Sequence, residues 1–202
     1  MTTLFLVRHA VTSHTGNKLT GWMEGVSLSQ EGRKQAGIAA EGLAHVNFDA
    51  IYSSPIERTL ETARAIADRQ AARVKVRRGL GEVEYGAWTN RSLKTLAKTK
   101  LWEQVQRFPS AARFPDGESL REVQSRAVTE IERIVAEHPK GKICCVSHGD
   151  VIKLIAAHYL GVHIDLYQRI VIGPASVSVI SVTSHGPYVI ALNNTPLAPA
   201  EP

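Results

Sequence analysis

The sequence predicts an α/β fold: a three-layer sandwich whose mainly parallel central sheet carries helices on both faces. Short apolar runs with the character of strands alternate with helical patterns along the chain, as a parallel sheet requires. Three of these runs, residues 4–7, 50–52 and 143–146, are followed directly by polar residues. Ligands of open α/β sheets bind beyond the carboxyl ends of the strands, so these three ends predict one shared pocket.

The individual elements follow from local signals. Proline suits a first helical turn, so a helix is expected to start at Pro55, directly after a strand. Ser119 and Glu122 have the spacing of a capping box and predict the start of a long helix. The full expected order is a strand at 4–7, a polar loop at 11–28, a helix at 29–44, a strand at 50–53, a helix from 55, a strand at 74–77, one or two short helices within 91–108, a helix at 119–137, a strand at 143–146, a helix at 150–160 and strands at 176–183 and 188–192.

Length and composition predict one domain. The 202 residues, 44 % of them apolar, suffice for a sizeable core, and no repeat or domain linker interrupts residues 1–202. The Pro- and Ala-rich residues 196–202 predict a disordered tail. Cys144 and Cys145 are neighbours on a strand and point to opposite faces, so we expect buried free thiols and no disulfide.

Apolar runs and charge restrict the location and the partners. No apolar stretch approaches the ~18 residues of a membrane span, and too few apolar residues precede Arg8 for a signal-peptide core. We therefore expect a cytoplasmic protein that does not bind membranes. The net charge of +5 can steer an anionic substrate, but it forms no basic tract, so nucleic acid is not an expected partner. Without a Gly-rich nucleotide loop or clustered metal-ligand spacing, we expect no cofactor and no metal.

Arg8 and His9 directly follow the first strand. A lone histidine at a strand end usually has a structural role, but this charged pair at the mouth of a buried strand cannot lie wholly in the core. A neutral imidazole can attack phosphorus when its other ring nitrogen donates its hydrogen to an acceptor. A neighbouring guanidinium binds phosphoryl oxygens through its planar fork of donors. The pair is therefore a candidate nucleophile with a phosphate ligand beside it.

Two further candidates follow the other strand ends. Arg58 lies near the start of a helix, where anions are favoured, although a solvated arginine paired with Glu57 or Glu61 is the plainer interpretation. His148 lies between an apolar strand and Gly149, which opens a helix. From there His148 can add an N–H donor to the same pocket.

A phosphoryl-transfer site also needs an acid, because an alkoxide leaves more readily when it is protonated. A carboxyl group with a raised pKa can supply that proton at neutral pH. Glu82 and Glu84 both lie in the segment 80–88, and their spacing does not choose between them. Tyr85 and Trp88 of the same segment are interpreted as packing residues.

These motifs resemble, in their order, those of the histidine phosphatase superfamily, in its phosphoglycerate-mutase-like branch, over nearly the whole chain. The resemblance implies that His9 accepts the phosphoryl group and that Glu82, not Glu84, donates the proton. The residues around the phosphate would be Arg8, Arg58 and His148. The matching blocks are Arg8-His9, Ser53-Ser54-Pro55-Ile56-Glu57-Arg58-Thr59 with Thr62-Ala63, Leu80-x-Glu82 with Gly86 and Trp88, and Ser147-His148-Gly149.

Three positions depart from the family pattern. Ala10 stands where the family has a glycine, so the turn after His9 is altered, and we expect activity to survive. Thr15 stands where the family has an asparagine, and Asn17 follows two positions later, so either residue is a candidate substrate contact. Asn90 replaces a common glycine.

We interpret the protein as a metal-independent phosphatase that hydrolyses small phosphate monoesters through a phosphohistidine on His9. The alternative is a cofactor-dependent phosphoglycerate mutase-type phosphomutase, because Thr20-Gly21-Trp22 resembles the substrate loop of mutases. Thr20 and Gly21 of this loop are accordingly candidate substrate contacts, as is Gly149 of the Ser147-His148-Gly149 block. Mutases carry an Arg-rich insertion after the Trp block, whereas residues 91–113 are shorter and carry their cations singly. A non-catalytic phospho-ligand-binding module is disfavoured, because such relatives typically lose the nucleophile or the acid.

Substrate specificity is expected to come from residues 11–26 and 91–118. Glu118 either faces the pocket or favours the start of the following helix through its charge, and we prefer the second interpretation. The expected partner is a small phosphorylated substrate, with sugar phosphates, phosphoglycerate derivatives and cofactor-precursor phosphates all open. The resemblance also leaves a homodimer open.

Overall fold

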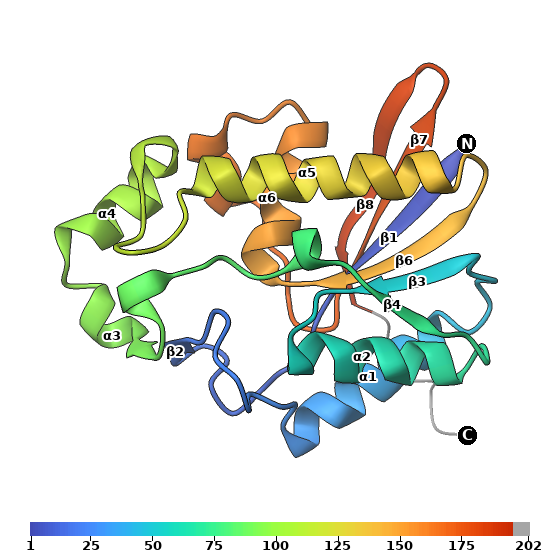
Figure 1. The fold of residues 1–202 in the computed structure, drawn as a ribbon, viewed down its shortest axis with the longest axis horizontal. Coiled ribbons are helices and arrows are strands. Elements are labelled where there is room, and N and C mark those ends of the chain that lie inside the picture. The colour runs from blue at the N-terminus through green and yellow to red at the C-terminus, as the bar shows by residue number, and fades with distance from the viewer. Residues whose placement is uncertain (196–202) are drawn as a thin grey trace.

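Residues 1–195 are described by a computed structural model, in which a six-stranded sheet lies between layers of helices (Figure 1). In their order across the sheet, the strands are β4 (Val74–Val76), β3 (Ala50–Ser53), β6 (Lys142–Ser147), β1 (Thr2–Arg8), β7 (Val177–Thr183) and β8 (Gly186–Asn194). The predicted sandwich with a mainly parallel sheet is confirmed. The predicted tail at 196–202 lies outside the described residues.

The register of the parallel strands brings their carboxyl ends together. β4, β3, β6 and β1 are parallel, whereas β7 runs antiparallel to β1 and β8 antiparallel to β7. Ser147 at the end of β6 pairs with Arg8 of β1, and Val146 pairs with Ser53 of β3. Residues far apart in the sequence therefore meet at one edge of the sheet, where ligands of such folds bind.

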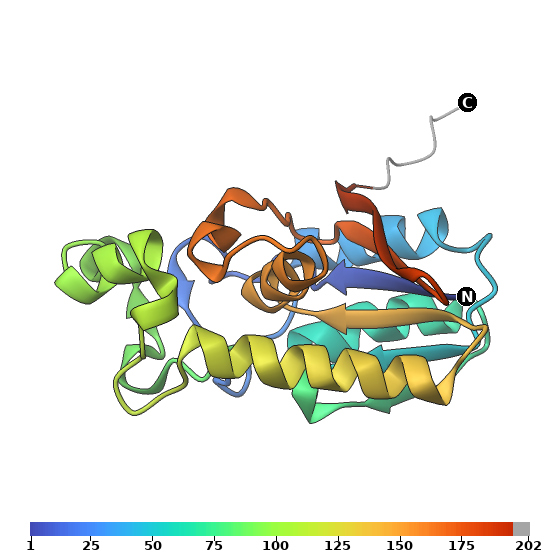
Figure 2. The same cartoon turned by 90° about the horizontal axis from the view of Figure 1, so that it is seen from above.

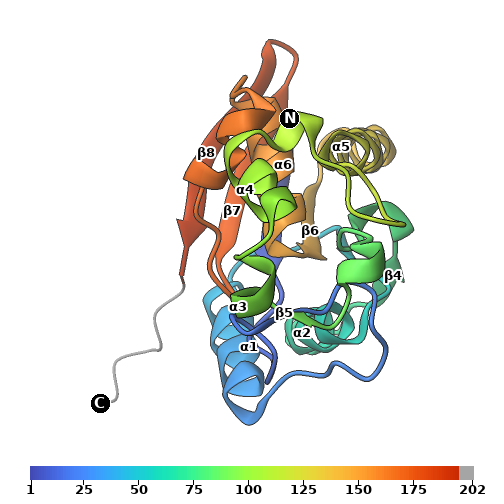
Figure 3. The same ribbon diagram turned by 90° about the vertical axis from the view of Figure 1, so that its left-hand side faces the viewer.

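Two pairs of helices cover the sheet. α1 (Gln30–Gly42) and α2 (Glu57–Asp68) lie on one face, and α5 (Leu120–Glu137) and α6 (Gly149–Tyr159) lie on the other (Figure 3). Ala63 and Ile66 of α2 contribute to the first core, and Ile131 of α5 contributes to the second. Removal of these side chains from water is the main stabilising contribution of both layers.

β6 is buried on both faces, as its cysteines show. Cys144 belongs to the core under α1 and α2, and Cys145 belongs to the core under α5 and α6. Both are buried free thiols, as predicted. Burial raises the pKa of Cys144 to about 12, so this thiol stays protonated and unreactive at neutral pH.

The predicted start of a helix at Pro55 is wrong by two residues. Ile56 precedes the helix in an extended conformation, and α2 begins at Glu57. The hydroxyl of Thr59 donates to the carbonyl of Ser54 at 3.0 Å. This side-chain bond, and not a helical turn, holds the backbone at the proline.

The other helix and strand bounds lie close to those predicted. The capping box of Ser119 and Glu122 is confirmed, with both of its hydrogen bonds present at the start of α5. The last strand is longer than predicted, because pairing with β7 extends β8 to Gly186 and Asn194. Within residues 1–195, no helix combines the length and apolar character that crossing a membrane requires.

A small second sheet was not predicted. β2 (Lys18–Leu19) pairs with β5 (Arg91–Ser92), and the two-residue strands are too short to give a periodic signal. This sheet joins the loop after β1 to α3 (Leu93–Leu96) and α4 (Lys100–Arg107), which lie beyond the carboxyl ends of the parallel strands (Figure 2). The remaining helical turns are 3-10 helices at Arg78–Leu80, Gly86–Trp88, Pro109–Ala111 and Ile164–Arg169.

Ile131 tests the packing of α5 on the sheet, because its side chain is fully buried. Replacement of Ile131 by alanine is expected to lower the free energy of unfolding by about 2–5 kcal/mol, through lost burial and a residual cavity. Urea denaturation measures the change. Arg133→Ala on the exposed face of the same helix is the control, with an expected change of less than about 0.5 kcal/mol. Equal effects of the two substitutions would contradict the described packing.

Candidate active site

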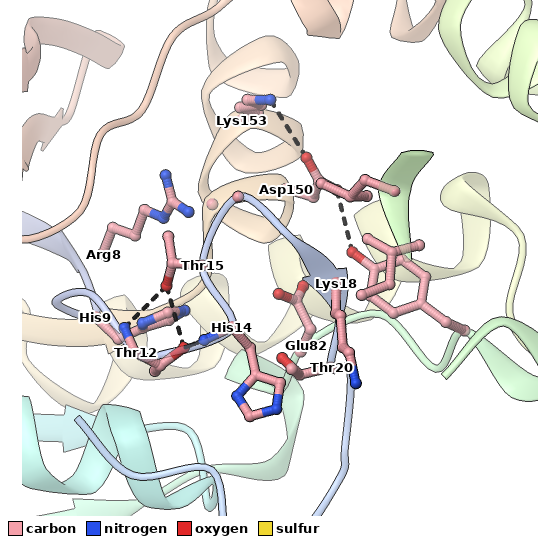
Figure 4. Close-up of a pocket in the computed structure, with 15 residues that line it drawn as sticks. Arg8, His9, Thr12, His14, Thr15, Lys18, Thr20, Glu82, Asp150 and Lys153 are labelled. Carbon is pink, nitrogen blue, oxygen red and sulfur yellow. Dashed lines mark hydrogen bonds and ion pairs between the residues drawn. The ribbon is translucent and has the colours of Figure 1, made fainter. Parts of the chain in front are cut away.

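The predicted pocket lies at the carboxyl ends of β1 and β6, and Figure 4 shows the side chains that line it. Its walls come from residues 8–20, 82–85 and 149–153, together with Leu93 from α3. Arg58 and His148 are fully buried behind this wall. Arg58 contacts the imidazole of His9, and His148 contacts the carboxyl group of Glu82. The structure thus brings together the strand-end residues that the sequence singled out.

The contacts of His9 define its tautomer. Nδ1 lies 2.7 Å from the carbonyl oxygen of Ala10, which can only accept, so Nδ1 carries the hydrogen. Nε2 accepts a hydrogen bond of 3.2 Å from Nε of Arg58. Nε2 therefore presents a lone pair, as an attacking nitrogen must.

His9 is also held in its neutral form. Burial, and then the positive charge of Arg58, lower its pKa well below the usual value, against the opposing effect of the Ala10 carbonyl. The residue is only 6 % exposed. At neutral pH the imidazole is unprotonated at Nε2 and can act as a nucleophile.

The two arginines retain unpaired hydrogen-bond donors. Arg8 donates from Nη1 to the carbonyl of Ile172 at 2.7 Å, and Arg58 donates from Nη2 to the carbonyl of Gly21 at 2.9 Å. Nε of Arg8 and Nη1 of Arg58 are buried and have no partner among the described residues. Buried unpaired donors are costly, so the arrangement favours an anion that accepts from them.

His148 lies between the other charged groups. Its Nδ1 accepts from Nη2 of Arg58 at 3.2 Å, so its Nε2 carries the hydrogen and donates to the hydroxyl of Ser54 at 2.9 Å. Burial, and then Arg58, lower its pKa well below the usual value. In this tautomer His148 orients Arg58, and a donor role towards phosphate requires a proton on Nδ1.

Glu82 is the carboxyl group of this site. Its Oε1 accepts from the amide of Val83 at 3.0 Å, and its Oε2 lies 3.9 Å from Nη2 of Arg58 and 3.7 Å from Nδ1 of His148. Burial, and then the negative charge of Asp150, raise its pKa to about 7, although Arg58 opposes this. Its protonated form is therefore well populated at neutral pH, which suits a general acid.

The alternative acid lies elsewhere. Glu84 is exposed and forms an ion pair of 3.0 Å with Arg78. Burial and position therefore distinguish the two glutamates, which their spacing in the sequence does not.

The structure places some of the candidate substrate contacts in the pocket wall and others outside it. Thr15, Thr20 and Gly149 line the pocket. Asn17 is exposed, and its carbonyl accepts from the amide of Leu93. Gly21 binds Arg58 through its carbonyl, so it positions the guanidinium.

Gly149 is close to Arg8, and its lack of a side chain keeps that contact open. A Cβ atom at this position would lie 3.1 Å from Nε of Arg8, which is tighter than ordinary packing. Glycine therefore leaves room for the guanidinium and for a ligand bound to it.

Two residues of the pocket wall, Asp150 and Lys153, were not predicted from the sequence. Asp150 and Lys153 lie together on α6, 3.3 Å apart, and Tyr85 donates to Asp150 at 3.2 Å (Figure 4). Tyr85 thus combines its predicted packing, against Phe114, with a position in the pocket. The available signal was the position of Asp150 in the first turn of a helix that follows a strand end, where ligands of such sheets bind.

Other lining residues carry further polar groups. Thr12, His14 and Lys18 come from the loop after β1. The hydroxyl of Thr15 accepts from the amide of Thr12 at 2.9 Å and lies 3.1 Å from the hydroxyl of Thr12. Within residues 1–195, no three side chains of His, Cys, Asp or Glu converge so that they could hold a metal ion.

The family model of the histidine phosphatase superfamily (branch 1) matches residues 4–195. The chain therefore belongs to this superfamily, and the resemblance observed in the sequence is confirmed. It is accordingly an enzyme of the histidine phosphatase type.

Three relatives illustrate the range within the family. Phosphoserine phosphatase 1 of Hydrogenobacter thermophilus is 30 % identical over 199 residues, covering 96 % of this chain and 93 % of that protein. Probable phosphoglycerate mutase GpmB of Yersinia pestis is 26 % identical over 180 residues, covering 88 % and 84 %. The crystal structure of a phosphoserine phosphatase mutant from Entamoeba histolytica, in complex with phosphoserine, superposes with a TM-score of 0.88 at 25 % identity, covering 96 % and 98 %.

Asp150→Asn tests the electrostatics of the pocket. Loss of a negative charge is expected to lower the pKa of Glu82 from about 7, because its ionised form is then repelled less. A ¹³C NMR titration of the Glu82 carboxyl group measures the shift. Asp68→Asn, at the exposed end of α2, is the control and should leave the titration unchanged. An unchanged midpoint in Asp150→Asn would contradict the described coupling.

Proposed function

We propose that the protein hydrolyses small phosphate monoesters through a phosphohistidine on His9. The observation that carries the proposal is the neutral imidazole, whose Nε2 lone pair is fixed by Ala10 and Arg58. The unpaired donors of Arg8 and Arg58 beside it suit the oxygens of a phosphate group. Nucleophile and anion-binding groups thus occur at one place.

The first step transfers the phosphoryl group to the enzyme. Nε2 of His9 forms an N–P bond as the ester P–O bond breaks, and protonated Glu82 gives its proton to the leaving oxygen. In the second step water attacks phosphorus, the N–P bond breaks, and ionised Glu82 takes the proton from water. Phosphoryl transition states are loose, so positioning and charge stabilisation by Arg8 and Arg58 supply most of the acceleration.

Hydrolysis is favoured over mutase chemistry by the cations around the pocket. A mutase must hold a second phosphate, which needs further unpaired cations. The cations of 91–113 are exposed, and Arg107 and Arg113 form ion pairs with Glu103 and Glu122. Of the two lysines that line the pocket, Lys153 is paired with Asp150, and Lys18 donates to the side chain of Asn90 and is the single lining lysine without an acidic partner among residues 1–195.

The leaving-group side of the pocket is polar. Lys18, Asp150 and Lys153 bring charges of both signs to it. Small alcohols with charged substituents therefore suit it, and we propose this substrate class. Phosphoserine, which carries both an ammonium and a carboxylate group, is the first ester to assay, since two of the relatives above are phosphoserine phosphatases.

The test of the proposal is phosphate release from a panel of esters, with 3-phosphoglycerate isomerisation assayed in parallel. Release without isomerisation supports the phosphatase. Isomerisation that depends on a bisphosphoglycerate primer would establish the mutase instead. Silence in both assays would favour a binding module.

His9→Ala is expected to reduce phosphate release to the assay background, because the attacking nitrogen is lost. Wild-type enzyme quenched in alkali during turnover should carry a phosphoryl label, which is stable in alkali and labile in acid. Undiminished release from His9→Ala would exclude the proposed intermediate. His45→Ala, an exposed histidine after α1, is the matched control.

Glu82→Gln is expected to slow the hydrolysis of alkyl phosphates by about 10²–10⁴-fold, because the leaving alkoxide loses its acid. Nitrophenyl phosphate has a good leaving group, so its phosphorylation step should slow much less. Steady-state rates and the initial burst of nitrophenol measure the difference. Equal slowing of that step for both esters would contradict the role of Glu82.

A further inference from the structure

Arg126 lies on α5, outside the pocket wall, and binds the loop that carries Glu82. Its Nη1 donates to the carbonyls of Gly79 and Gly81 at 3.0 and 2.9 Å. Its Nη2 donates to the carbonyl of Glu82 itself at 2.8 Å. One guanidinium therefore binds three carbonyls within four residues of a single loop.

Glu118 takes the remaining donors of that guanidinium. Its two oxygens accept from Nε and Nη2 of Arg126 at 2.6 and 2.9 Å, in a bidentate pair. All five N–H groups of Arg126 are thus engaged. The same carboxylate accepts from the amide of Glu84 at 2.9 Å, and the amide of Glu118 donates to the carbonyl of Glu84.

These contacts add to the role expected for Glu118, which was to favour the start of the following helix through its charge. It neither lines the pocket nor serves as the cap of α5, which is formed by Ser119 and Glu122. The segment of Glu118 instead lies against the loop, and a Cβ atom at Gly117 would collide with the carbonyl oxygen of Glu84. Glycine at this position permits the close approach.

The backbone of the loop determines the direction of the Glu82 carboxyl group. Residues 81–85 belong to no helix or strand, so no ladder of regular hydrogen bonds holds them. The carbonyl of Glu82 accepts from Arg126 and also from Nε1 of Trp22 at 2.6 Å. Oε1 is bound to the next amide, that of Val83, which leaves Oε2 facing Arg58 and His148.

We propose that Arg126 and Glu118 are positioning residues for the acid: they hold the loop 79–84 so that Oε2 of Glu82 faces the reacting phosphate. The proposal rests on the proposed function and deepens it, by assigning a role to two residues that do not touch substrate. Proton transfer requires the acid to lie within hydrogen-bond reach of the leaving oxygen. Displacement of the loop therefore impairs protonation more than it impairs phosphate binding.

The experiment compares an alkyl phosphate from the active panel with nitrophenyl phosphate in Arg126→Met, Arg126→Lys and Glu118→Gln. Arg133→Met, an exposed arginine of the same helix, is the matched control. Thermal unfolding identifies the variants that remain folded, and only these are compared. In Arg126→Lys the positive charge remains but the planar set of guanidinium donors is lost. In Glu118→Gln the shape of the side chain remains but its charge is lost. Because both changes are mild, at least one of these variants should fold.

For Arg126→Met we expect kcat for the alkyl phosphate to fall about tenfold or more, as part of the contribution of a general acid. The rate of the nitrophenol burst and the KM values of both esters should change by less than about threefold, because the substitution leaves the groups that bind phosphate unchanged. Arg126→Lys and Glu118→Gln should lower kcat by a smaller factor, and again more for the alkyl phosphate than for nitrophenyl phosphate. Arg133→Met should match the wild type.

Combination with Glu82→Gln separates positioning from general damage. Once the acid is absent, Arg126→Met should cause little further loss with the alkyl phosphate, because the two substitutions remove the same contribution. Additive losses, equal slowing of both esters, or wild-type rates in the folded mild variants would each overturn the proposal. Failure of the proposed function would instead appear as phosphate release that survives His9→Ala, whatever Arg126 does.

Discussion

The guanidinium of Arg58 lies almost completely out of water, 1 % exposed, and contacts both histidines of the pocket. A buried cation is costly unless acceptors surround it. Gly21, His9 and His148 supply these acceptors, and Glu82 supplies the nearest negative charge. Burial has the largest effect on both imidazoles, and the charge of Arg58 lowers their pKa further, which keeps each neutral. The protonation states of the site thus follow mainly from burial, and the charge of Arg58 strengthens the effect at both histidines and opposes it at Glu82.

The sheet and its helices hold that charge in place. Parallel pairing of β6 with β1 and β3 fixes where the three strand ends lie, and α2 begins beside them, so that Arg58 lies in its first turn. Glu82 differs, because its segment has no regular secondary structure. Side-chain bonds from Arg126 and Trp22 to its backbone replace the missing ladder. Glu82 is therefore held from outside the pocket, whereas Arg8 and Arg58 are held by the sheet and by the helix that follows β3.

Much of the fold could be predicted, since strands and helices carry periodic local signals. The start of α2 was misplaced because Pro55 fits either a first turn or the extended residue before it. The strand-end candidates Arg8, His9 and His148 came from the same periodicity. Lys153 was missed because a lysine on an amphipathic helix looks like any solvated lysine, and nothing local shows that it lines a pocket with residues from the loop after β1.

By itself, the sequence determined the layer order, the parallel sheet, the free thiols and the set of polar residues at strand ends, because each depends on residues close together in the chain. The tertiary structure buried Glu82 beside Arg58 and left Glu84 exposed, placed Thr15 rather than Asn17 in the pocket wall, and joined Glu118 to the loop that carries Glu82. Burial, pKa and hydrogen-bond partners depend on residues far apart in the chain, such as Arg58 and His148, which are 90 positions apart. Such contacts exist only once the chain has folded, and spacing along the chain does not encode them.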